Sequence, residues 1–190
     1  MKNSLYLYLL SAVFFLLSAT SIYANKLTVV FNENMYKNKL FQSDFSITGD
    51  ISYDTIEAIQ NGITANMFVT FQLLRSKSII ARGRNLKGEI VYSFTISYDV
   101  WENSFIIIYN ETTYYVDKSS DIIGEIEKMI SPLSMKVNPE HEKEKFILRA
   151  KIKVETIKLY PPLGIFLIFI DPWNYESGWI NTDVFTLEQL

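Results

Sequence analysis

The stretch that decides the fold is Ile90-Val91-Tyr92-Ser93-Phe94-Thr95-Ile96-Ser97-Tyr98, in which apolar side chains stand at every even position. Strict alternation over this length indicates a β-strand with one buried face. We expect the even-numbered side chains to point into the core, with Phe94 at the centre. Glu102-Asn103 then makes a turn, and residues 105–109 return as the next strand. The segment therefore predicts an antiparallel hairpin.

Working outward, the same alternation predicts further strands on both sides of this hairpin. Strands are expected at residues 26–31, 40–47, 63–73, 112–116 and 146–154. A helix is predicted over 52–60, capped by Ser52 and ended at Gly62, and a second over 120–130, capped by Ser119 or Ser120. Residues 75–88 are interpreted as a loop, with or without a short strand at 79–80, and residues 138–145 as a charged link.

Strands with one apolar face must close against a second layer. The pattern predicts a mainly β fold, an antiparallel β-sandwich with two short helices. The alternative is an α+β fold in which a curved antiparallel sheet is covered by the helices. Residues 25–190 are long enough for one β-rich domain with its own core.

The N-terminus has the pattern of a secretory signal peptide over residues 1–24. Lys2 is followed by an apolar run over residues 5–17, and Ala24 provides the small residue before the cut. The apolar run is shorter than the roughly 20 residues of a membrane span. We expect a secreted or periplasmic protein, the alternative being anchorage by an uncleaved N-terminal helix.

Composition narrows the function classes. The chain has no cysteine, which excludes disulfides, thiolate metal sites and cysteine nucleophiles. Without Lys2, 17 basic and 21 acidic residues give a net charge of −4. This sign argues against nucleic acid as a main partner.

Two clusters contain residue types that serve in catalysis or metal binding. His141, the single histidine, lies among Glu140, Glu142 and Glu144, but one imidazole without cysteine does not make a zinc site of the usual type. Asp99 and Glu102 flank Trp101, as in a sugar-cleaving site, but a hairpin end with a packed Trp explains the same residues. We predict no enzyme activity, no metal and no cofactor.

Two segments are candidates for contact with a partner or membrane. The first is a run of basic residues without an acid, Arg75, Lys77, Arg82, Arg84 and Lys87. The second is the tail, where the apolar run 163–170 is followed by Trp173 and Trp179. The run is either the core of the domain or a docking loop, and the tryptophans are of the kind found at interfaces.

At the tail the chain resembles a secreted bacterial family, the domain of unknown function 4390 family. The residues that carry the resemblance are Leu159-Tyr160-Pro161-Pro162-Leu163, then Trp173 and Ser177-Gly178-Trp179. The resemblance implies an envelope domain without known activity, and it supplies no catalytic residues. Together these observations predict a secreted or periplasmic, non-catalytic binding or accessory module whose partner is an envelope protein or membrane surface. The alternative is a membrane-associated protein that handles lipid or cell wall.

Overall fold

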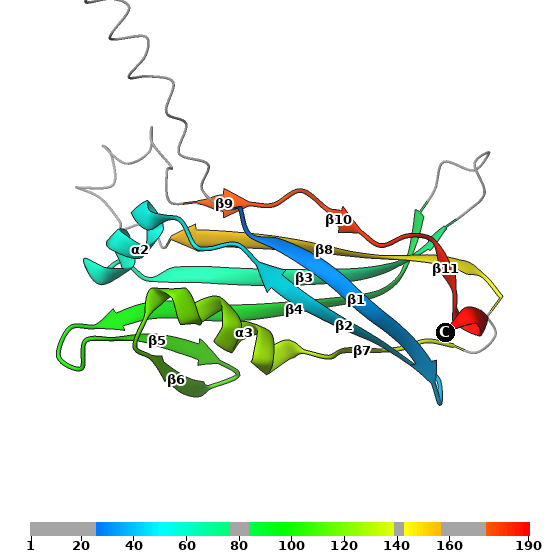
Figure 1. Cartoon of the computed structure of the whole chain (residues 1–190), viewed down its shortest axis with the longest axis horizontal. Coiled ribbons are helices and arrows are strands. Elements are labelled where there is room, and N and C mark those ends of the chain that lie inside the picture. Colours follow the sequence, from blue (N-terminus) through cyan, green and yellow to red (C-terminus); the bar gives the residue numbers. More distant parts are fainter. Residues whose placement is uncertain (1–25, 77–83, 139–142, 157–173) are drawn as a thin grey trace, which may run out of the picture.

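Two antiparallel sheets face each other in the computed structural model, which describes residues 26–76, 84–138, 143–156 and 174–190 (Figure 1). The larger sheet has the order β10-β8-β3-β4-β5-β6, with β9 and β11 also paired to β8, and the smaller sheet has the order β1-β2-β7. The strands are β1 (Thr28–Lys37), β2 (Leu40–Thr48), β3 (Ala65–Ser76), β4 (Arg84–Asp99), β5 (Ser104–Tyr109), β6 (Thr112–Val116), β7 (Leu133–Lys136), β8 (Lys145–Thr156), β9 (Tyr175–Glu176), β10 (Ile180–Asn181) and β11 (Phe185–Thr186). The helices are α2 (Tyr53–Gln60) and α3 (Ile122–Ile130), with short 3-10 turns η1 (Ser119–Asp121) and η3 (Leu187–Gln189).

The predicted hairpin is formed by β4 and β5, and its inward face is as expected. Phe94 and Ile96 have no exposed surface, and Phe94 stacks on Tyr109 with ring centroids 4.8 Å apart. The neighbouring strand β3 pairs with β4 in a register that places Met67 beside Phe94. Because side chains alternate along a strand, this register puts every second residue of both strands in the core.

The second layer combines the smaller sheet with the helices. β1 and β2 cross over the larger sheet (Figure 1), and Phe45 of β2 packs on Phe71 of β3 with ring centroids 4.8 Å apart. Helix α3 is tied to β2 because the Ile47 N–H donates a hydrogen bond of 2.6 Å to Glu127 Oε2. The expected mainly β fold with antiparallel sheets and two short helices is confirmed. The layer that covers the larger sheet contains a second sheet, as in the predicted β-sandwich, and helices, as in the predicted α+β alternative.

The predicted cap and end of helix α2 are correct, whereas the start of helix α3 differs from the prediction. Ser52 Oγ accepts a hydrogen bond from the Thr55 N–H at 3.3 Å, and Gly62 beyond the helix has a φ of 90° that favours glycine. For α3 the predicted serine cap is wrong. Its first turn is preceded by η1, Asp121 stands at the cap position, and no side chain caps the helix.

Two further interpretations were wrong. Residues 75–88 are not all loop, because β3 continues to Ser76 and β4 begins at Arg84, with these two residues paired. Backbone pairing continues there past a register shift at Leu73 and Leu74, where alternation is lost and the sequence signal disappears. The strand β7, which begins shortly after the end of α3, was also missed, because its four residues are too few for an alternation to be recognised.

The C-terminal tail adds short strands to the edge of β8. Next to these short strands, side chains of the tail replace backbone acceptors at every fourth residue of β8. The β8 N–H groups of Leu148, Ile152 and Thr156 donate to Thr182 Oγ1, Ser177 Oγ and Asn174 Oδ1, at 3.1, 2.9 and 2.9 Å. The apolar run 163–170 lies outside the described residues, so its interpretation as core or docking loop stays a prediction.

Candidate functional site

The first candidate site is an open hollow at the end of the molecule where β1 turns into β2. Asn38 and Lys39 form this turn with φ values of 54° and 64°, and Lys37 pairs with Leu40 across it. Two-residue turns with positive φ match the twist of an antiparallel pair. The Val137 N–H donates a 3.0 Å hydrogen bond to the Lys39 carbonyl, which holds the end of β7 against the turn.

Three exposed lysines, Lys37, Lys39 and Lys136, surround this hollow, which we call the lysine hollow. Its volume is about 740 Å³. The rest of its described lining is either apolar or carries an amide: Leu40, Val137, Asn38, Gln42 and Asn138. Among these described lining residues there is no Asp or Glu, so together they carry a net positive charge. A concave surface of one charge sign concentrates ligands of the opposite sign.

The predicted basic segment contributes partly to the same end of the molecule. Arg75 Nη2 forms a 2.7 Å ion pair with Glu144, which offsets its charge. Lys87 is half-buried. The next residue, Gly88, lies close to the side chain of Met135 in β7. Lys77 and Arg82 lie outside the described residues, and of Arg84 only the backbone is described. The hollow lysines were missed because they come from a turn and a short strand far apart in the chain, with no local run of charge.

Trp179 lies against Arg149 and Lys151, on the face of β8 that points away from the core. The Arg149 guanidinium stands 4.0 Å from the centre of its ring and Lys151 Nζ stands 5.1 Å away. Arg149 also donates two hydrogen bonds to Gln72 Oε1, at 2.8 and 2.6 Å, and Gln72 donates to Glu89. These contacts make a cross-strand ladder and give Trp179 a structural explanation. Trp173 lies outside the described residues.

The second candidate site is the turn between β4 and β5, residues 99–103, which we call the Trp101 turn. Asp99 Oδ1 accepts hydrogen bonds from the backbone N–H groups of Trp101 and Glu102, at 2.8 and 3.2 Å. The Tyr98 hydroxyl donates to Asn103 Oδ1 at 2.6 Å. Trp101 is 96% exposed, so the expectation of a packed Trp was wrong. Asp99 therefore holds the shape of the turn.

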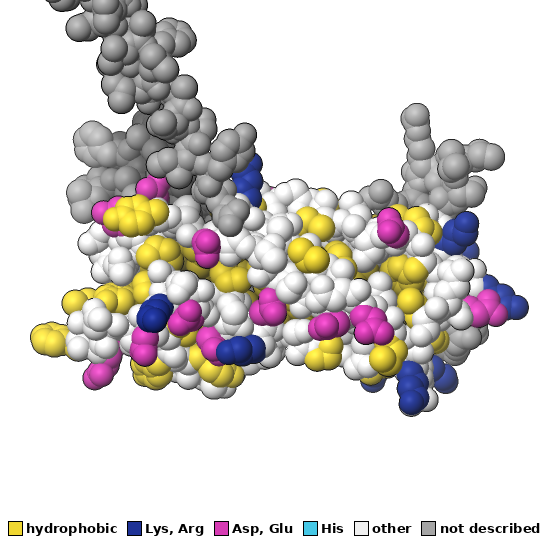
Figure 2. Space-filling model, in the orientation of Figure 1, with side chains coloured by type: hydrophobic (Ala, Val, Ile, Leu, Met, Phe, Trp, Pro, Cys, Tyr) yellow, Lys and Arg dark blue, Asp and Glu magenta, His cyan; other side chains and the backbone are white. Residues whose placement is uncertain are grey.

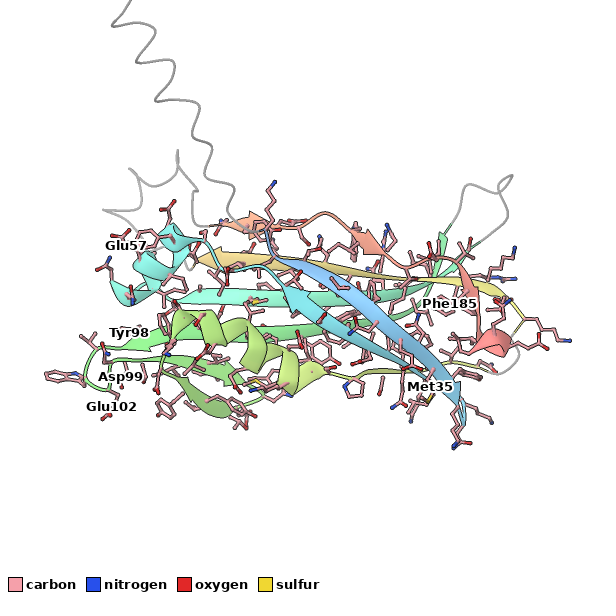
Figure 3. All side chains as sticks on the ribbon, in the orientation of Figure 1. Met35, Glu57, Tyr98, Asp99, Glu102 and Phe185 are labelled. Carbon is pink, nitrogen blue, oxygen red and sulfur yellow. The ribbon has the colours of Figure 1, made fainter. Side chains whose placement is uncertain are left out.

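The two candidate sites lie at opposite ends of the molecule and differ in charge. Glu57, Asp99 and Glu102 lie at one end and Met35 lies close to the other (Figure 3). Lys and Arg side chains gather around the end formed by the β1–β2 turn, whereas Asp and Glu predominate over the helices and the Trp101 turn (Figure 2). On the face shown, the two ends of the described protein therefore differ in the sign of their charge.

A smaller apolar cavity of about 130 Å³ lies where β1 begins. Tyr175 lines it and donates a 2.8 Å hydrogen bond to the Leu27 carbonyl, and burial raises the pKa of the Tyr175 phenol.

Within the described ranges no three His, Asp or Glu side chains are grouped to hold a metal. Helices in those ranges are all too short or too polar to cross a membrane. His141 lies outside them.

Comparison with known proteins identifies the family. The model of the domain of unknown function family DUF4390 matches residues 35–183, so the chain belongs to this family. The matched range includes both candidate sites and the Ser177-Gly178-Trp179 segment, and it confirms the resemblance inferred from the tail. Searches of curated proteins and of solved structures gave no match.

Proposed function

We propose that the protein is a secreted or periplasmic, non-catalytic binding or accessory module, and that it binds an anionic ligand in the lysine hollow. The observation that carries this proposal is the meeting of Lys37, Lys39 and Lys136 around one concavity whose described lining has no acid. The signal-like residues 1–24 and the lack of cysteine support a place in a bacterial envelope.

The described groups with shifted pKa values are not gathered at the lysine hollow. Burial raises the pKa of Tyr92 and Tyr175, and hydrogen bonds within surface ion pairs raise those of Lys128 and Lys153. The hydrogen bond from Lys151 lowers the pKa of Glu176. Catalytic groups with tuned pKa values are expected to gather in a cleft. None of these groups lines the lysine hollow.

The alternative, a membrane-associated protein that handles lipid or cell wall, has weaker support. A lipid carrier needs an apolar cavity large enough for an acyl chain. The apolar cavity beside Tyr175 measures about 130 Å³, whereas small-molecule sites typically have about 300–1,000 Å³. The lysine hollow falls within that range, and its lining is charged and amide-rich. A soluble or polymeric anion therefore fits the described surface better.

The test is a titration of the mature protein into fluorescein-labelled poly-L-glutamate, followed by fluorescence anisotropy. The variant Lys37→Gln/Lys136→Gln should raise Kd about tenfold, since each exposed ion pair contributes up to about 1 kcal/mol. Lys118→Gln/Lys128→Gln removes the same charge elsewhere on the surface and should leave Kd nearly unchanged. Equal binding by both double variants, or no binding by the natural protein, would overturn the proposal.

A further inference from the structure

We infer that the anionic partner of the lysine hollow is the Trp101 turn of a second copy of this chain, so that molecules associate head to tail. The inference rests on the proposed function, because it names the partner of the same hollow. The proposed contact joins the lysine hollow, which is basic and concave, to the Trp101 turn, which is acidic and projects from the end of the molecule.

The Trp101 turn has the properties of an interface anchor. Trp101 is 96% exposed and its neighbour Val100 is 73% exposed, an unusual concentration of apolar surface at a hairpin tip. The hydrogen bond that Asp99 accepts from the Trp101 N–H and the one that Tyr98 donates to Asn103 hold the turn in one shape. A tryptophan on a pre-formed tip loses little conformational entropy on docking, and tryptophan is enriched among the residues that dominate binding energy.

The lysine hollow is complementary to this tip in both charge and surface type. Half-buried Leu40 offers apolar surface for an indole, and the lysines around it carry the charge opposite to that of the Asp99 and Glu102 carboxylates. Lysine also attracts the face of an indole ring directly. The molecule uses this contact at Trp179, where Lys151 Nζ lies 5.1 Å from the ring centre.

The position of the two sites determines the mode of assembly. The Trp101 turn lies at one end of the larger sheet, and the β1–β2 turn lies at the other (Figure 1). They cannot meet within one molecule, so one end of each molecule must engage the opposite end of the next. Such heterologous contacts form rings or open filaments. An anionic bilayer is a poorer partner for the turn, since its acidic flanks would be repelled.

Sedimentation velocity of the mature protein provides the test, over concentrations up to about 1 mM, where weak association is populated. We expect the mean sedimentation coefficient to rise with concentration, and to rise less when salt goes from about 0.05 M to about 1 M, where screening shortens to roughly 3 Å. Trp101→Ala should weaken association about 30-fold or more, as truncation of an interface anchor does. Tyr115→Ala, which removes another exposed aromatic at 64% exposure, should not.

Mixing two variants makes the test specific for head-to-tail contact. Trp101→Ala keeps the hollow, and Lys37→Glu/Lys136→Glu keeps the Trp101 turn, so neither assembles alone, but the mixture should form a one-to-one complex. Lys118→Glu/Lys128→Glu has the same net charge as the second variant and should still assemble alone.

A natural protein that stays monomeric at all concentrations, or a mixture that forms no complex, would overturn the inference. Binding of poly-L-glutamate through Lys37 and Lys136 would in that case leave the proposed function standing. Failure of both experiments would overturn both proposals.

Discussion

Ser177 and Ile152 are joined by two hydrogen bonds across the edge of the larger sheet. The Ser177 N–H donates to the Ile152 carbonyl at 2.8 Å, and the Ile152 N–H donates to Ser177 Oγ at 2.9 Å. The side chain thus accepts a bond that a regular strand would accept with its backbone. This lets the tail leave strand geometry between β9 and β10 without leaving a donor of β8 unpaired.

Ser177→Ala should lower the free energy of unfolding by about 1–3 kcal/mol, because it leaves the buried Ile152 N–H without an acceptor. Urea denaturation measures the change, and hydrogen exchange at the Ile152 amide should become faster. Ser119→Ala, at an exposed position, should change stability by less than about 0.5 kcal/mol. Equal small effects at both serines would mean that the hydroxyl of Ser177 is dispensable.

Phe94→Ala should cost about 3–5 kcal/mol, because the side chain is fully buried and stacks on Tyr109. Val91→Ala, on the same strand but 53% exposed on the opposite face, should cost less than about 1 kcal/mol. Thermal or urea unfolding of the two variants compares the faces directly. A reversed order of the two losses would show that the register of β4 is inverted.

Stability should fall as pH rises above about 10, the ordinary pKa of tyrosine. Burial raises the pKa of Tyr175 and of Tyr92. The neighbouring Tyr109 adds a smaller increase to the pKa of Tyr92. Between the tyrosine pKa of the unfolded chain and the higher pKa in the folded protein, the folded protein holds protons that the unfolded chain has released. The stabilisation from these protons is therefore complete below about pH 10 and is lost as the pH rises through the folded pKa. Urea unfolding from about pH 9 to about pH 11 should show this decline.

Tyr175→Phe isolates one of the two groups. The variant should be less stable at neutral pH, since it loses the hydrogen bond to the Leu27 carbonyl, and its alkaline decline should be shallower. An unchanged slope in this variant would assign the decline to other tyrosines.

Processing of the N-terminus is a separate prediction from the sequence. Expressed in a bacterial host, the mature protein should begin at Asn25 and occur in the periplasmic fraction, since residues 1–24 have the pattern of a cleaved signal. N-terminal sequencing of the fractionated protein checks both points. Recovery of intact Met1 in the membrane fraction would favour the uncleaved anchor instead.

The fold was predictable where side chains alternate over a whole strand. Alternation identified β3, β4 and β8 and the inward face of β4, because period two is imposed by the strand itself. It missed the extension of β3 and β4 around Arg75, where the strands continue through charged residues past a register shift. It also missed β7, whose four residues are too few for a period to be recognised.

The candidate sites were predictable only in part. The chain around Trp101 was singled out, but its exposure depends on what packs beside the turn, and no local pattern reports that. The basic run from Arg75 to Lys87 was visible as a run, yet Arg75 is paired with Glu144, which lies far along the chain. The lysine hollow has no local signal, because its members are brought together by the pairing of β2 with β7.

The sequence by itself determined the periodicity of the strands, the cap and stop of α2, the absence of thiol chemistry and the family of the chain. These properties depend on neighbouring residues or on residue type, so they can be found without a structure. The tertiary structure alone decided which charges meet and which side chains remain exposed. It gathered Lys37, Lys39 and Lys136 at one end and left Trp101 exposed at the other. Strand pairing between distant segments sets those positions, and the energy of such pairing is absent from any single segment.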